Sequence, residues 1–143
     1  MTETDRAVST TVGYAIALSI TTILVSGLLV SAGHVVDSRE KTTVRSELEV
    51  VGERVVSGLM AADRLAATDG ANDVAVSVNL PSRVAGNGYS IEIKSDEVIL
   101  EADSVRTSVT VPVETSTTLS TGTVSGGSIR IELSGGNLEV RSA

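Results

Sequence analysis

Few residues of this chain are of the types that carry out catalysis, and their spacing does not suit it. The single histidine, His34, excludes a multi-histidine metal site or a histidine-based catalytic triad within one chain. The absence of cysteine excludes thiol catalysis and thiolate metal sites. Glu101 and Asp103 could lie on one face of a strand as a carboxylate pair, but no nucleophile or oxyanion donor lies near them in the sequence. We therefore expect no catalytic residues and no enzyme.

Two segments contain residues that occur in ligand-binding loops. Asp69–Asp73 has acidic and amide side chains but lacks the Asp-x-Asp-x-Asp-Gly spacing of a calcium loop, so a helix cap followed by a turn is favoured. Gly122–Gly127 lacks the Gly-x-x-x-x-Gly-Lys pattern of a phosphate-binding loop and is typical of a flexible turn. His34 follows an apolar run, a position that favours an interface residue. We predict no metal site and no cofactor.

The charge balance is acidic. Eighteen Asp and Glu against eleven Lys and Arg give a net charge of −7, so nucleic acid is not an expected partner. Nine of the eleven basic residues are arginine, and together with the acidic excess this resembles the surface of halophilic proteins, with an ordinary acidic protein as the alternative. The chain has no Phe or Trp, so its core must be built from small β-branched side chains, which suit strands.

The stretch from Ala7 to Gly33 contains no charged residue in 27 positions. A helix of that length is roughly 40 Å long, which exceeds the ~30 Å hydrocarbon core of a bilayer. Its Ser and Thr hydroxyls can bond to carbonyls one turn back, so lipid tolerates them. The sequence predicts a membrane-inserted helix over residues 8–36, with lipid as a partner. No second apolar run of this length follows, so the chain crosses a membrane once at most.

The following segment, residues 37–69, has the pattern of an amphipathic continuation of the same helix. Five apolar residues step by three or four positions and form one stripe: Val44, Leu48, Val51, Val55 and Leu59. We expect the helix to begin near Val8 and to stop at Asp69-Gly70, where glycine supplies the cap. Gly52 and Gly58 would let another helix approach closely.

From Val74 onward the apolar period changes to two. About six short strands with hairpin turns are predicted within residues 70–143, forming a small antiparallel sheet or sandwich. Glu114–Gly127 is expected to be a loop or a weak strand around Leu119. One long helix followed by such a domain defines the α+β class.

Near its beginning the chain reads Arg6-Ala7-Val8-Ser9, followed by a charge-free run that contains Gly13. This pattern resembles the class III signal peptide of archaeal type IV pilins and archaellins. It implies that a prepilin peptidase-like membrane protease cuts between Ala7 and Val8 and removes residues 1–7. The proline common in the family after the cut is absent. The region from Leu80-Pro81 to Ser125-Gly126-Gly127 is similar to the C-terminal half of small haloarchaeal pilin-like proteins.

The resemblance implies a filament subunit whose N-terminal helix packs against other pilin subunits, with an extracellular β domain on a single membrane span. Small residues would mark the helix contacts: Gly13, Ser26, Gly27, Ser31 and Gly33. Charge alone argues for the opposite orientation, because one basic residue, Arg6, precedes the run and Arg39, Lys41 and Arg45 follow it. The alternative is a membrane-anchored surface domain or a minor pseudopilin that forms no filament.

Overall fold

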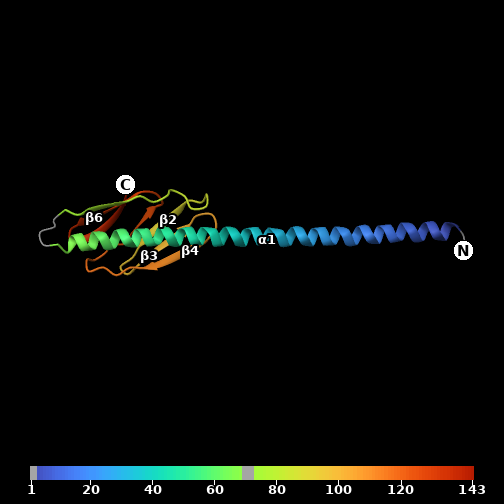
Figure 1. Cartoon of the computed structure of the whole chain (residues 1–143), viewed down its shortest axis with the longest axis horizontal. Helices are drawn as coiled ribbons and strands as arrows, with labels where there is room; N and C mark the ends of the chain where they lie inside the picture. Colours follow the sequence, from blue (N-terminus) through green and yellow to red (C-terminus); the bar gives the residue numbers. More distant parts are fainter. Residues whose placement is uncertain (1–2, 69–72) are drawn as a thin grey trace. The chain divides into compact units, whose positions relative to one another are not determined.

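The computed structural model describes residues 3–68 and 73–143, with side chains from Val8 onward, as one long helix followed by seven strands (Figure 1). The helix α1 spans Glu3–Ala66. The strands are β1 (Ala75–Val78), β2 (Tyr89–Ile93), β3 (Glu97–Ala102), β4 (Ser108–Pro112), β5 (Gly122–Ser125), β6 (Ile129–Ser134) and β7 (Asn137–Ser142). This architecture confirms the predicted α+β class.

The helix begins earlier than predicted, at Glu3 rather than near Val8. Nothing in residues 3–7 interrupts a helix, because this segment contains neither glycine nor proline. At the other end α1 stops at Ala66, and Thr68 donates its backbone N–H to the Leu65 carbonyl over 3.1 Å in a tight final turn. The predicted stop at Asp69-Gly70 lies outside the described residues.

The chain divides into two compact units, Met1–Arg39 and Glu40–Ala143, and α1 contributes to both. In the second unit the predicted apolar stripe is buried, and none of its five members is more than 3% exposed. These residues share one core with side chains from both sheets, among them Ile91, Leu100, Ile131 and Leu138. The second half of α1 is therefore part of the β domain.

The strands form two sheets. The smaller has the order β1-β6-β7 and the larger has the order β4-β3-β2-β5, and every neighbouring pair is antiparallel. Leu119 forms a parallel bridge to Leu138 in β7, and the chain then enters β5 in the other sheet. We expected about six strands, a loop or a weak strand around Leu119 within Glu114–Gly127, and a flexible turn over Gly122–Gly127. Leu119 does form a bridge, but the expectation is wrong at Gly122–Ser125, which forms the seventh strand, β5. Thr123 and Val124 pair with β2, which supplies a partner that local sequence does not reveal.

Gly52 and Gly58 lie where α1 approaches the two sheets. A Cβ atom on Gly52 would lie 2.7 Å from Val111 Cγ2, and one on Gly58 would overlap Val78 Cγ2 and lie 3.1 Å from Ile131 Cδ1. The close neighbours of these glycines are thus strand side chains and not another helix, which corrects the sequence interpretation. The absence of side chains there lets the helix pack directly on both sheets.

Tyr89 is the aromatic residue of the buried core and contacts two loops. Its hydroxyl donates a hydrogen bond of 2.6 Å to the Pro81 carbonyl, and its ring occupies the space that a side chain at Gly126 would need. The backbone N–H of Gly126 also donates to the Tyr89 carbonyl over 2.7 Å. Burial raises the pKa of the Tyr89 phenol. A single aromatic side chain therefore joins the start of β2 to two loops.

Candidate functional site

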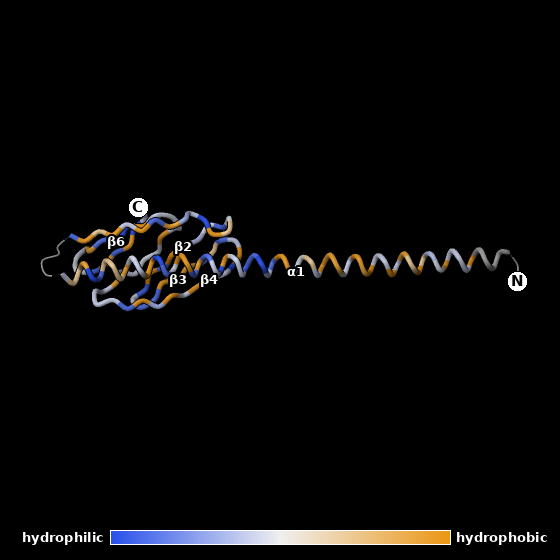
Figure 2. The backbone as a smooth tube through the Cα atoms, in the orientation of Figure 1, coloured by the Kyte–Doolittle hydropathy of each residue, from blue (hydrophilic) through white to orange (hydrophobic). Residues whose placement is uncertain are grey.

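The most prominent surface of the first unit is the apolar segment of α1 from Val8 to Val36. Each of its residues is exposed, including Tyr14 at 71% and Leu28 at 70%. Figure 2 shows the hydrophobic colour along this segment and a hydrophilic stretch after it. The helix is long and apolar enough to cross a membrane. Within residues 3–68 and 73–143, this is the one candidate membrane span, and it lies near the N-terminus.

The hydroxyl groups within this segment are bonded inside the helix. Ser19, Thr21, Thr22 and Ser26 each donate a hydrogen bond of 2.8 Å to the carbonyl four residues earlier. A hydroxyl that is satisfied by its own helix needs no water molecule. These polar residues are therefore compatible with lipid or with a dry helix interface.

The five small residues predicted to mark helix contacts lie on two different faces of α1. At about 100° per residue, Gly13, Gly27 and Ser31 fall within about 40° of one another around the helix. Ser26 and Gly33 lie about 100–160° away from these three residues around the helix. Added Cβ atoms at Gly13, Gly27 and Gly33 would meet no atom within 4 Å, so these positions are open in the single chain. We call Gly13, Gly27 and Ser31 the small-residue stripe.

The predicted cleavage residues Arg6, Ala7 and Val8 all lie within α1. The side chains of Arg6 and Ala7 lie outside the described part of the structure, and cleavage stays a prediction. His34 lies near the end of the apolar segment, and its side chain is exposed. Ser38 is also exposed, and its hydroxyl donates a hydrogen bond of 2.8 Å to the His34 carbonyl.

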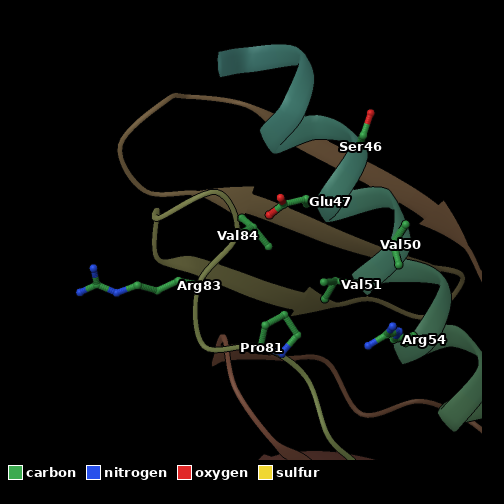
Figure 3. A pocket seen from close by; sticks show the side chains of 8 residues that line it. All are labelled: Ser46, Glu47, Val50, Val51, Arg54, Pro81, Arg83 and Val84. Carbon is green, nitrogen blue, oxygen red and sulfur yellow. The ribbon is translucent and has the colours of Figure 1, made fainter. Parts of the chain in front are cut away.

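A second candidate surface is a groove of about 370 Å³ on the β domain (Figure 3). It lies between one face of α1 and the loop after β1, and its lining residues are Ser46, Glu47, Val50, Val51, Arg54, Pro81, Arg83 and Val84. Val51 and Val84 are buried, whereas Val50 is 51% exposed. The Arg83 side chain extends away from the groove (Figure 3). The groove offers an apolar floor but no group of catalytic residues.

Two carboxylates of α1 hold loops of the β domain. Glu47 accepts a hydrogen bond of 2.5 Å from the backbone N–H of Ala85, a residue in the left-handed region at φ 44°. Asp63 accepts hydrogen bonds from the backbone N–H groups of Ser116 and Thr117. The sequence did not identify Glu47 as a contact residue, because no local signal indicates a backbone partner 38 residues away.

The carboxylate pair considered in the sequence does not form a site. Glu101 is the exposed residue of β3, and Asp103 follows the strand. Among the described side chains, residues 8–68 and 73–143, no group of three or more histidine, cysteine, aspartate or glutamate residues could hold a metal ion. The calcium-like segment Asp69–Asp73 lies almost entirely outside the described residues.

A family model of unknown function, DUF7266, matches residues 3–143. The chain belongs to this family. The match covers both the apolar helix and the β strands, so both parts belong to the sequence that defines the family. No curated protein and no solved structure matches the chain.

Proposed function

We propose that this DUF7266 protein is a type IV pilin-like structural protein, a subunit of an archaeal cell-surface filament that is held in the membrane before assembly. One observation carries the proposal. The described side chains from Val8 to Val36 are all exposed, whereas the apolar stripe of α1 from Val44 to Leu59 is buried in the core of the β domain. A helix with these two different halves needs a second apolar environment for its first half.

The size of the apolar surface supports this requirement. Fourteen large hydrophobic side chains between Val8 and Val36 are between 49% and 71% exposed. At about 1.5 kcal/mol for each buried side chain, their burial contributes roughly 20 kcal/mol before entropy is counted. Lipid provides this environment for a single chain. Neighbouring helices provide it in a filament, where the small-residue stripe would let backbones approach closely.

The β domain needs no contribution from the first half of the helix. Its core consists of residues from Val44 to Val140, all within the unit Glu40–Ala143. A domain with a complete core of its own can stay folded while the apolar segment moves from lipid to a helix bundle. This independence supports a subunit that is stored in a membrane and then assembled.

The proposed location is a single membrane span with the β domain outside the cell and in a surface filament after assembly. The orientation rests on the resemblance of Arg6-Ala7-Val8 to a class III signal peptide, since charges flanking the run favour the reverse. The proposed partners are a prepilin peptidase-like protease, membrane lipid and other subunits.

Mass spectrometry of the native N-terminus tests the proposal. We expect mature chains that begin at Val8, and we expect Arg6→Glu to leave the precursor uncut. Thr4→Ala, a change in the same leader that keeps the cleavage residues, should be processed normally. Native protein that still begins at Met1 or Thr2 would contradict the pilin function and favour a permanently anchored surface domain.

A further inference from the structure

The outer face of the three-stranded sheet carries its charges in two rows of opposite sign. In the antiparallel register of β6 and β7, Arg130 lies opposite Arg141, and Glu132 lies opposite Glu139. Two arginines therefore form one row across the strands, and two glutamates form the next row. We call this surface the charge-row face.

This arrangement brings like charges together, which is unfavourable between directly opposite residues on a sheet. Each arginine is paired along its own strand instead. Arg130 Nε lies 2.5 Å from Glu132 Oε1, and Arg141 Nη2 lies 2.9 Å from Glu139 Oε2. The four side chains nevertheless remain 35–60% exposed. The pairs thus relieve the repulsion without covering the charges.

Small residues of β1 extend both rows. Ser77 lies opposite Arg130, and Ala75 lies opposite Glu132, and both are exposed. The other sheet differs, since strands β2 to β5 contain no arginine or lysine, and their exposed charges include Glu92 and Glu101. In a chain of net charge −7, two such faces would repel each other. The charge-row face differs because it carries both positive and negative charges.

We propose that the charge-row face binds the same face of a second copy of this chain. A two-fold axis that runs between the rows and parallel to them places each arginine row against the glutamate row of the partner. The contact is self-complementary, as a two-fold interface requires. Arg130 and Arg141 then lie near glutamates of both copies. The glutamates of the partner also reduce the repulsion between the two arginines, which lie opposite each other within one sheet.

The contact does not depend on the proposed filament function, because it uses only the β domain. A two-fold interface closes after two copies. It would therefore connect neighbouring filaments or neighbouring anchored chains and would not lengthen a filament. The surface is small and charged, so the association is expected to be weak and to decrease as the salt concentration rises.

Cross-linking of the full-length chain in phosphatidylcholine vesicles tests this contact. The chain has no cysteine, so Ser77→Cys introduces a unique thiol beside the arginine row, and a short bis-maleimide reports its distance from the same thiol in a second copy. Two charge variants are compared in this background. Arg130→Glu with Arg141→Glu makes the face wholly negative, and Glu132→Arg with Glu139→Arg makes it wholly positive. Tags of different size distinguish the two in mixtures.

We expect the parent to cross-link and each charge variant alone to lose about tenfold or more of the product, because several ion pairs reverse together. A mixture of the two variants should restore the cross-link between differently tagged chains. The matched control, Glu92→Arg with Glu101→Arg on the other sheet, should cross-link like the parent.

The proposal is wrong if either charge variant alone cross-links like the parent, or if the mixture fails to recover. A fourfold neutral variant with glutamine at the same positions separates lost attraction from added repulsion, since it removes all four charges without adding repulsion, and it must also lose the cross-link. Recovery in the mixture shows that both charge variants are folded. Processing at Val8 is measured separately in each variant. If the cross-linking results contradict the contact but the chain is processed normally at Val8, the proposed pilin function is unaffected.

Discussion

The Asp63 carboxylate of α1 accepts a hydrogen bond of 2.7 Å from the backbone N–H of Thr117, 54 residues farther along the chain. It accepts a second bond of 2.9 Å from the N–H of Ser116. These bonds hold the segment before Leu119, which pairs with β7 and leads into β5. One side chain of the helix therefore positions the connection between the two sheets.

Replacement of Asp63 by alanine should destabilise the β domain. Both backbone donors would lose a charged acceptor, and we expect a cost of about 1–2 kcal/mol in the free energy of unfolding. Glu53→Ala removes an exposed carboxylate of the same helix and should change stability by less than about 0.5 kcal/mol. Denaturant unfolding of the full-length chain in detergent, followed by circular dichroism, gives both values. Equal effects of the two substitutions would show that the loop bonds contribute nothing.

The same residue predicts a pH dependence. Burial raises the pKa of Asp63, but the hydrogen bonds from Ser116 and Thr117 outweigh this effect and lower the pKa below its ordinary value of 3.8. A carboxyl whose pKa is lower in the folded state stabilises the fold above the unfolded pKa. That contribution is lost as the pH falls through the folded pKa. The stability difference between wild type and Asp63→Asn should therefore be constant near neutral pH and shrink below about pH 4. A difference that grows on acidification would contradict this assignment.

Gly58→Ala should destabilise the protein although alanine is the better helix former. In an open helix the change would add about 1 kcal/mol of stability. Here the new methyl group would overlap Val78 and crowd Ile131, and overpacking of this kind costs about 1–3 kcal/mol. Ser57→Ala, at the exposed neighbouring position, is the control and should not lower the melting temperature. A stabilised Gly58→Ala variant would mean that the helix is not held closely against β1 and β6.

Gly27→Leu should impair filament formation while membrane insertion and the β domain stay intact. Gly27 lies on the small-residue stripe with Gly13 and Ser31, and a leucine there would keep a neighbouring helix at a distance. Ala32→Leu enlarges a small residue away from this stripe, and cells with this variant should form more filaments than Gly27→Leu cells. Electron microscopy of surface preparations compares the strains. Normal filaments from Gly27→Leu cells would exclude the stripe as a contact. If wild-type cells also lack filaments containing this chain, the anchored alternative replaces the filament function.

The amino-acid sequence by itself determined the elements that rest on local pattern. The 27 charge-free positions from Ala7 to Gly33 predicted an apolar helix long enough to span a membrane, and the spacing from Val44 to Leu59 predicted the buried stripe. Hairpin turns were also predicted, and the turn between β6 and β7 contains Gly135 and Gly136, whose positive φ angles of 59° and 86° suit glycine. Periodicity and turn chemistry act over a few residues, so the sequence displays them directly.

Tertiary structure alone decided the features that join distant segments. The strand β5 forms because β2 pairs with it, although its own sequence resembles a loop. Gly52 and Gly58 are needed because strand side chains approach them, and Glu47 and Asp63 find backbone partners 38 to 54 residues away. The opposition of Arg130 to Arg141 is likewise a matter of strand register. Register and packing depend on which surfaces meet in the folded chain, and no local pattern carries that information.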